Sequence, residues 1–64
     1  MNGFRAMRIR AKIKQIDAAE RLGVNQSTVS MWESGENKPR ADILLDIAKA
    51  YDCTVDDLLR DDSA

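Results

Sequence analysis

A glycine at position 23 separates two short segments of helical character, and this arrangement limits the folds open to the chain. The stretch is residues 15–35, QIDAAERLGVNQSTVSMWESG. Glycine adopts a positive φ without steric cost, so Gly23 suits a helix that ends in a sharp turn. Asn25 is a good N-cap, whose side-chain oxygen can accept a free N–H of the second helix. We therefore predict a helix over residues 15–22, a turn at Gly23 and a second helix over residues 26–34.

The apolar residues of this stretch predict how the two helices pack. Ala18 and Ala19 are small, as required where two helices cross closely. Larger apolar residues are expected to lock the two helices together, namely Leu22, Val24, Val29 and Trp32. On the second helix, at 100° per residue, Trp32 and Glu33 fall within about 60° of Val29 and define the core side.

The other side of the second helix carries no charge. Between Leu22 and Trp32 there is no Asp, Glu, Lys or Arg, although 33% of the chain is charged. A solvated helix face normally carries Lys and Glu. A neutral face rich in Gln, Ser and Thr is better suited to meeting the edges of DNA bases.

In register from residue 8 to residue 59, the chain resembles the DNA-binding helix-turn-helix of the phage-repressor family, which includes lambda repressor, Cro and the bacterial XRE-type regulators. The residues that carry the resemblance are Arg8, Gln15, Ala18, Ala19, residues 22–24, residues 26–30, Trp32, Glu33, Gly35, Lys38, Pro39, Leu44, Leu45, residues 47–50 and residues 56–59. The resemblance implies an all-α fold, a compact five-helix bundle that forms one domain over residues 1–64 and binds operator DNA.

The helix over residues 26–34 is expected to read the major groove with its N-terminal residues. Gln pairs bidentately with adenine, Ser and Thr bond several base edges, and Met can touch a thymine methyl group. The predicted base-reading residues are Gln26, Ser27, Thr28, Ser30 and Met31. Contacts to the DNA backbone, which position a protein without reading sequence directly, are predicted for Lys14, Gln15, Ser34, Asn37, Lys38 and Arg40. For Gln15 this role is implied by the resemblance.

Each of these assignments has a simpler alternative. Met31 is also explained as a partly exposed surface methionine, and Gln15 as a tolerated polar residue at the start of a helix. Lys38 and Arg40 are also explained as ordinary solvated charges. Trp32 is assigned to the core rather than to a platform on which bases stack.

The first helix, predicted over residues 3–12 with Asn2 as its cap, has an arginine on its apolar face. Four residues share that face at the spacing i, i+3, i+4, i+7: Phe4, Met7, Arg8 and Ala11. A charge in that position is out of place unless it is paired. Glu33 lies on the core side of its own helix and has the opposite sign. Residues at matching positions of the resembling family form a buried ion pair, which the resemblance implies for Arg8 and Glu33.

Further helices are predicted over residues 41–51 and 55–59. Thr54 and Asp57 have the spacing of a capping box at the start of the last helix, and Cys53 is interpreted as a small core residue. The resembling family usually has a glycine near position 12, where this chain has Lys12. The turn after the first helix is therefore expected to close in another way. Residues 61–64 are predicted to be a frayed tail.

The net charge of −1 conceals two halves of opposite sign. Residues 1–40 contain eight Lys or Arg and four Asp or Glu, whereas residues 41–64 contain two Lys or Arg and seven Asp. The basic half is suited to face phosphates while the acidic half faces away from DNA or faces a partner. Chance segregation with solvated faces is the simpler alternative.

Several classes of protein are disfavoured by composition. With one cysteine and no histidine, the sequence offers no disulfide framework and no ordinary zinc site. It has no apolar run of the length that a membrane span needs and no signal-peptide pattern. No cofactor, metal or small-molecule ligand is expected, and no catalytic constellation indicates an enzyme. The expected compartment is the cytoplasm of a bacterium, with the gene bacterial or phage-encoded.

The function predicted from these residues is a sequence-specific regulator of transcription, a repressor that binds double-stranded operator DNA. One such helix reads too few base pairs to select a site, so a homodimer on an inverted repeat is expected. The candidate dimer surface is the region of the last two helices, with Val55, Leu58 and Leu59 near the chain end. The alternative is a small helical protein-interaction module or antitoxin that binds its partner through the acidic half.

Overall fold

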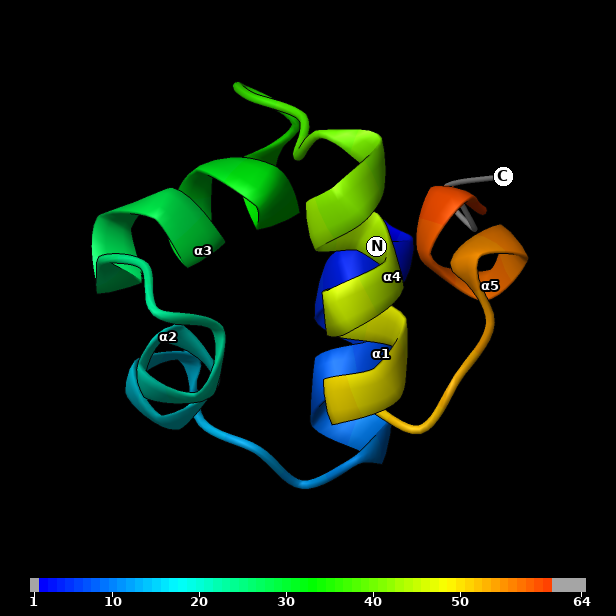
Figure 1. The fold of residues 1–64 in the computed structure, drawn as a ribbon, viewed down its shortest axis with the longest axis horizontal. Helices are drawn as coiled ribbons and strands as arrows, with labels where there is room; N and C mark the ends of the chain where they lie inside the picture. The colour runs from blue at the N-terminus through cyan, green and yellow to red at the C-terminus, as the bar shows by residue number, and fades with distance from the viewer. Residues whose placement is uncertain (1, 61–64) are drawn as a thin grey trace.

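The computed structural model describes residues 2–60, which form five helices (Figure 1). These are α1 (Gly3–Arg10), α2 (Gln15–Leu22), α3 (Gln26–Ser34), α4 (Ala41–Ala50) and α5 (Val55–Leu59). The predicted all-α bundle of five helices is therefore confirmed. The tail predicted for residues 61–64 lies outside the described residues. The longest of the five helices has ten residues, about half the length needed to cross a bilayer.

Three helices have the predicted bounds, and each is delimited by a recognisable residue. Gly23 and Gly35 follow α2 and α3 in the left-handed conformation, with φ of 70° and 83°. Thr54 and Asp57 form the predicted capping box of α5, in which each side chain bonds the backbone N–H of the other residue. The local signals in the sequence were sufficient to position these ends.

The other two helices are shorter than predicted. α1 was predicted to reach Lys12 but ends at Arg10, and α4 was predicted to reach Tyr51 but ends at Ala50. After each helix a residue other than glycine takes a positive φ, 61° at Lys12 and 53° at Asp52. The expectation that the first turn closes in another way was wrong, because Lys12 adopts the left-handed conformation that favours a glycine.

A smaller correction concerns Asn25. It is the N-cap residue of α3 by its backbone conformation, but its side chain makes no capping hydrogen bond. The carbonyl of Asn25 accepts the N–H groups of Thr28 and Val29 at 3.0 and 3.4 Å. The start of α3 therefore depends on backbone bonding, and the Asn25 side chain remains exposed.

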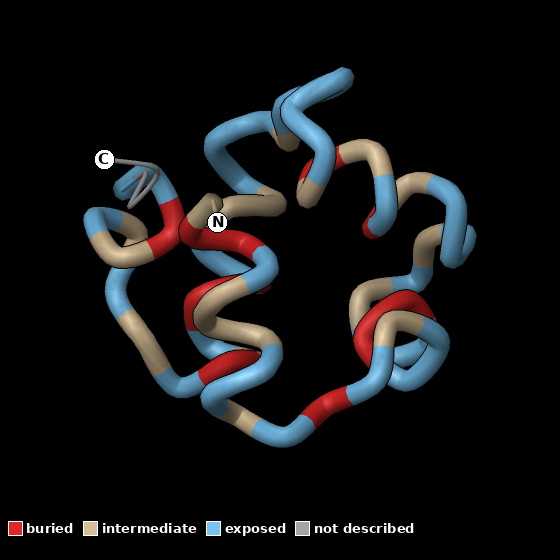
Figure 2. The backbone as a smooth tube through the Cα atoms, turned by 180° about the vertical axis from the view of Figure 1, so that it is seen from behind, coloured by how far each residue is buried: buried red, intermediate tan, exposed pale blue. Residues whose placement is uncertain are grey.

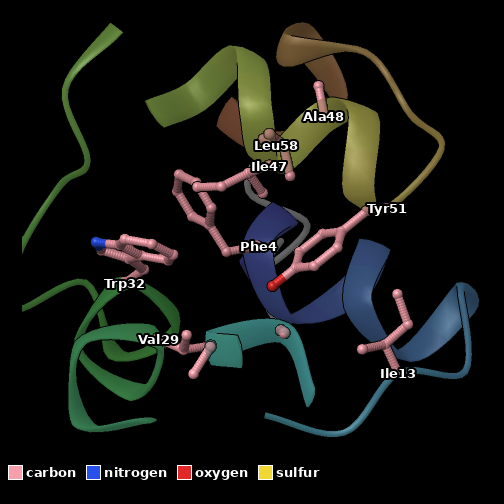
Figure 3. Close-up of a cluster of buried hydrophobic side chains, with 10 residues drawn as sticks. Phe4, Ile13, Val29, Trp32, Ile47, Ala48, Tyr51 and Leu58 are labelled. Carbon is pink, nitrogen blue, oxygen red and sulfur yellow. The ribbon is translucent and has the colours of Figure 1, made fainter. Parts of the chain in front are cut away.

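The helices surround one apolar core, to which all of them contribute (Figure 3). α2 packs against α3 and α4, whereas α1 packs against α3 and α5. Ala18 and Ala19 are buried where α2 meets its neighbours, as predicted. Phe4 and Trp32 pack with ring centroids 6.4 Å apart. The largest fully buried side chains are Tyr51, Ile47, Leu58 and Val29.

The apolar locks between α2 and α3 are confirmed with different degrees of burial. Val29 and Trp32 are in the buried core, and Leu22 and Val24 pack against it from partly exposed positions. Cys53 is likewise partly buried against the core rather than inside it. Figure 2 shows the inward sides of the helices buried and the chain that follows α3 exposed. This exposed loop and α3 border each other on one side of the molecule.

Candidate nucleic-acid interface

α3 presents an uncharged outer surface. The side chains of Gln26, Ser27 and Ser30 are exposed, and those of Thr28 and Met31 are partly buried. Val29 and Trp32, on the opposite side, are 0% and 3% exposed. The 100° spacing thus predicted correctly which side of α3 enters the core. The outward side of α3 therefore carries polar groups that can donate and accept hydrogen bonds but have no charge.

The inner side of α3 is tied to α1 by the predicted ion pair. Arg8 Nε lies 2.6 Å from Glu33 Oε2, and Arg8 Nη2 lies 3.0 Å from Glu33 Oε1. The two side chains are 12% and 5% exposed. The guanidinium and carboxylate therefore meet in the two-pronged geometry that Arg favours.

Each partner of the pair has a further hydrogen bond. Arg8 Nη1 donates to the backbone oxygen of Ile13 at 2.8 Å, and Gln15 donates to Glu33 at 3.1 Å. The hydrogen bond to Glu33 raises the pKa of Arg8, although burial opposes this rise. No buried side-chain nitrogen or oxygen in residues 2–60 lacks a hydrogen-bond partner, which is the condition for a tolerable buried ion pair.

Gln15 connects this buried pair to the outer surface of α3. Its Nε2 donates to Glu33, and its Oε1 accepts a long hydrogen bond of 3.5 Å from Gln26 Nε2. Gln26 keeps its own side-chain oxygen outside this contact. The predicted base-reading residue at the start of α3 and the predicted backbone contact at the start of α2 therefore lie side by side.

The loop after α3 brings together most of the other residues predicted to contact the DNA backbone. Ser34 donates to the Met31 carbonyl and accepts the Glu36 N–H, so its hydroxyl closes the end of the helix. Asn37 accepts the N–H of Lys38 at 2.9 Å. Both oxygens are therefore already used within the loop, whereas the Lys38 side chain forms no ion pair within residues 2–60.

Two of the predicted cations have different surroundings. Lys14 is exposed and is the N-cap residue of α2. Arg40 lies 3.7 Å from Asp42, with both side chains more than 70% exposed. An exposed pair at that distance contributes little stability. Arg40 is therefore able to exchange Asp42 for another anion at low cost.

Among the hydrogen bonds at this site that the sequence did not predict, two join a side chain to the main chain of another segment. Asn2 was assigned only as a helix cap, yet its side chain also donates to the backbone oxygen of Trp32 at 2.7 Å. The bond from Arg8 to the Ile13 carbonyl was not foreseen either. Both connect residues to the main chain of another segment, and no residue pattern signals such a bond before the packing is known.

The pair of helices joined by the turn at Gly23, with the second helix exposed along a neutral side, defines a helix-turn-helix. The helix-turn-helix family matches residues 4–58, so the chain belongs to this family. The resemblance to the phage-repressor group is confirmed by this family match and by a relative that is a phage repressor.

Two curated relatives are similar to the chain. Repressor protein C2 of Salmonella phage P22 is 38% identical over 59 residues, which are 92% of this chain and 27% of that protein. The HTH-type transcriptional activator BcrR of Enterococcus faecalis is 36% identical over 53 residues, which are 83% of this chain and 26% of that protein. The chain thus spans about a quarter of the length of these relatives. No solved structure was found to match it.

Proposed function

We propose that this domain is the sequence-specific DNA-binding part of a transcriptional regulator, and that α3 reads the major groove of double-stranded DNA. The observation that carries the proposal is the uncharged, exposed side of α3 beside a loop whose cations, Lys38 and Arg40, are exposed. One relative is named a repressor protein and the other an HTH-type transcriptional activator. Small polar side chains at the N-terminal end of an exposed helix match the geometry with which such helices contact base edges.

Within this proposal, α3 sets specificity and the neighbouring cations set affinity. The base-reading residues are Gln26, Ser27, Thr28, Ser30 and Met31. Residues that contact the DNA backbone are Lys14, Gln15, Ser34, Asn37, Lys38 and Arg40. Asn37 already uses its side-chain oxygen in the loop, so it would meet a phosphate through its amide N–H groups. The Ser34 hydroxyl already donates and accepts within the loop, so it would have to release the Met31 carbonyl to donate to a phosphate.

The division of roles is tested by two single variants measured against sequences selected from a random DNA pool. Gln26→Ala is expected to cost about 1–3 kcal/mol at one or two base positions and to leave the rest of the preference intact. Lys38→Ala is expected to weaken binding to all sequences alike and to flatten its salt dependence. The roles are reversed if Lys38→Ala alters the preferred sequence and Gln26→Ala does not.

Repression is the direction of regulation that we propose. The relative with the greater identity and coverage is named a repressor, although the second is named an activator. A protein bound over a promoter needs no surface other than its DNA-reading side to exclude another protein from the same DNA. A reporter gene controlled by the selected site should fall in expression when the chain is supplied, and a rise would contradict the assignment.

We also propose that two copies bind an inverted repeat, in contact through the α4–α5 region. Two reading helices must lie about 34–36 Å apart to enter successive turns of one side of the duplex. Leu58 is buried and belongs to the core, but Leu59 is 60% exposed. Leu59 borders a groove of about 370 Å³ that is also lined by Phe4, Trp32, Pro39, Leu44 and Leu58.

The dimer is tested by the stoichiometry of binding. Footprints should show two half-sites about one helical turn apart, with two chains per duplex at saturation. Leu59→Asp should weaken binding to the full repeat and leave binding to an isolated half-site unchanged. The matched control is Ile9→Asp, which places the same charge at an exposed apolar position on a different helix, α1. One chain per duplex on an unrepeated site would contradict the dimer and leave the reading by α3 intact.

A further inference from the structure

The side chain of Asn2 bonds two helices at once. Its Oδ1 accepts the backbone N–H of Arg5 at 3.0 Å, which caps α1, and its Nδ2 donates to the Trp32 carbonyl at 2.7 Å in the last turn of α3. The amide orientation is fixed by its partners, because an N–H faces one end and a carbonyl oxygen faces the other. The cap uses only the oxygen, so the bond to α3 is a separate function of the same side chain.

The Trp32 carbonyl depends on this bond. Near the end of a helix, carbonyl groups lack an ordinary partner in the next turn. Trp32 receives only a long bond of 3.4 Å from the Gly35 N–H within its own segment. The Asn2 amide supplies the shorter bond, in a partly buried position. The end of α3 is thus held from outside by the residue that begins α1.

α1 holds α3 at two separate points. Asn2 contacts the chain at Trp32, and Arg8 contacts the side chain of Glu33. Asn2 and Arg8 are six positions apart, which corresponds to about 9 Å along α1. On α3 their bonds reach adjacent residues, one at the Trp32 main chain and one at the Glu33 side chain. Together with the packing of α3 on α2 and the core, these two bonds fix how the last turn of α3 lies along α1. Gln26 lies six residues before Trp32, so a small tilt at the end of α3 is carried to its reading end.

The start of α1 is itself fixed on the opposite side. A Cβ atom added at Gly3 would lie 2.3 Å from the backbone oxygens of Asp57 and Leu58 in α5. Backbone atoms cannot move aside as a flexible side chain does, so Gly3 lies directly against α5. Asn2 therefore connects α3 to the start of α1, which packs directly against the backbone of α5.

We propose that Asn2 is a positioning residue for DNA recognition: by joining the start of α1 to the last turn of α3, it sets the angle at which α3 presents its reading side. This inference rests on the proposed reading of DNA by α3. Productive geometry at a recognition site requires placement to about 0.5 Å, and a directional bond of 2.7 Å meets that requirement where apolar packing alone is more permissive.

The test uses Asn2→Ser. Serine is as good an N-cap as asparagine, but its shorter side chain cannot cap α1 and reach the Trp32 carbonyl together. We expect the ratio of affinities for the selected sequence and for a scrambled duplex to fall about two- to tenfold. Binding to the scrambled duplex should be unchanged, because no cation is altered. Residual dipolar couplings of the free protein should show a changed angle between α1 and α3.

Thr54→Ala is the matched control. It removes a helix cap at the start of α5, where the Thr54 hydroxyl accepts the Asp57 N–H, and it leaves α3 untouched. It should lower the melting temperature without changing the ratio of the affinities for the selected and scrambled sequences, measured on an isolated half-site. An unchanged ratio or an unchanged angle in Asn2→Ser overturns the positioning role, as does an equal fall in Thr54→Ala. If the unsubstituted protein prefers no sequence, the proposed function has failed instead, and the angle still decides the role of Asn2.

Discussion

α1 meets α3, and α4 meets α5, through different kinds of contact. Between α1 and α3 there are directional bonds, from Arg8 to Glu33 and from Asn2 to the Trp32 carbonyl. No side-chain hydrogen bond within residues 2–60 joins α4 to α5, which pack through the buried core that contains Ile47 and Leu58. Apolar burial is favourable in any orientation, whereas a hydrogen bond has a preferred distance and angle. The hydrogen-bonded contact of α1 with α3, here called the polar junction, therefore specifies the direction of α3. The contact of α4 with α5, here called the apolar side, mainly supplies stability.

Breaking the polar junction should have the largest effect. Arg8→Ala leaves the Glu33 carboxylate buried with only Gln15 beside it, and we expect a loss of roughly 3–5 kcal/mol in the free energy of unfolding. Urea denaturation of the two proteins measures this loss. If both Arg8→Ala and Glu33→Ala keep the melting temperature of the parent protein, the pair has no role in stability.

An equal loss of stability on the apolar side should leave the DNA sequence preference unchanged, unlike a loss at the polar junction. Leu58→Ala should destabilise the protein by about 2–5 kcal/mol through the cavity it leaves but should preserve the preferred half-site sequence where the protein is still folded. Replacing both ion-pair partners, Arg8→Met with Glu33→Leu, should recover most of the stability and still weaken sequence preference. Retained preference in this double variant would contradict the positional role of the junction.

Tyr51 lies where the two regions meet, and its titration is the next largest expected effect. Burial, followed by the nearby Glu33 carboxylate, raises its pKa from 10.0 to about 12. The neutral phenol is therefore favoured in the folded state. The contribution of the neutral phenol to the free energy of unfolding is fully present below pH 10. It is lost as the pH rises to about 12, which lowers that free energy by roughly 2–3 kcal/mol.

This titration is directly observable because the chain has one tyrosine. Ultraviolet absorbance of tyrosinate should appear near pH 12 in the folded protein and near pH 10 in denaturant. Glu33→Gln should lower the folded pKa, since it removes a negative charge and leaves the opposing influence of Arg8. A folded-state pKa near 10, or no change on removing Glu33, would place Tyr51 outside the influence of the junction.

The sequence predicted the helix ends correctly where the local backbone conformation favours a particular residue type. Gly23, Gly35 and the Thr54–Asp57 capping box delimited α2, α3 and α5 correctly. The ends of α1 and α4 were misjudged by one or two residues, because Lys12 and Asp52 take the left-handed conformation without the glycine that would announce it. At both positions the next backbone N–H bonds back into the last helical turn, from Ile13 to Arg8 and from Cys53 to Ala48. This closure usually has glycine at the left-handed residue, so Lys12 and Asp52 give no residue signal for it.

The candidate site was predictable to a similar extent. Helical periodicity found the buried side of α3, and the ion pair followed from two charges in apolar positions together with the family resemblance. The second function of Asn2 was not predictable, because it depends on where the Trp32 carbonyl lies after α1 and α3 have packed. Side-chain bonds to a distant main chain are consequences of the fold rather than of the residue pattern.

The smallest expected effect concerns the two strained turns, one beside each region. Lys12 closes the turn before Ile13, whose carbonyl accepts Arg8, and Asp52 closes the turn after α4. The left-handed conformation costs an ordinary L-residue about 1–2 kcal/mol, but Asp tolerates it better than Lys. Allowing for the greater entropy that glycine loses on folding, Lys12→Gly should stabilise the protein by about 0.5–1 kcal/mol and Asp52→Gly by less.

Thermal or urea unfolding of Lys12→Gly, Lys12→Ala and Asp52→Gly measures this difference. Lys12→Ala removes the same charge as Lys12→Gly but keeps the strain, so equal gains in both would assign the effect to charge rather than to backbone conformation. If Asp52→Gly gains more than Lys12→Gly, strain is greater on the apolar side. A stabilised Lys12→Gly protein that keeps its DNA preference would show that the direction of α3 is set by the bonds of Arg8 and Asn2, because the turn between α1 and α2 could then be relaxed without moving the reading side.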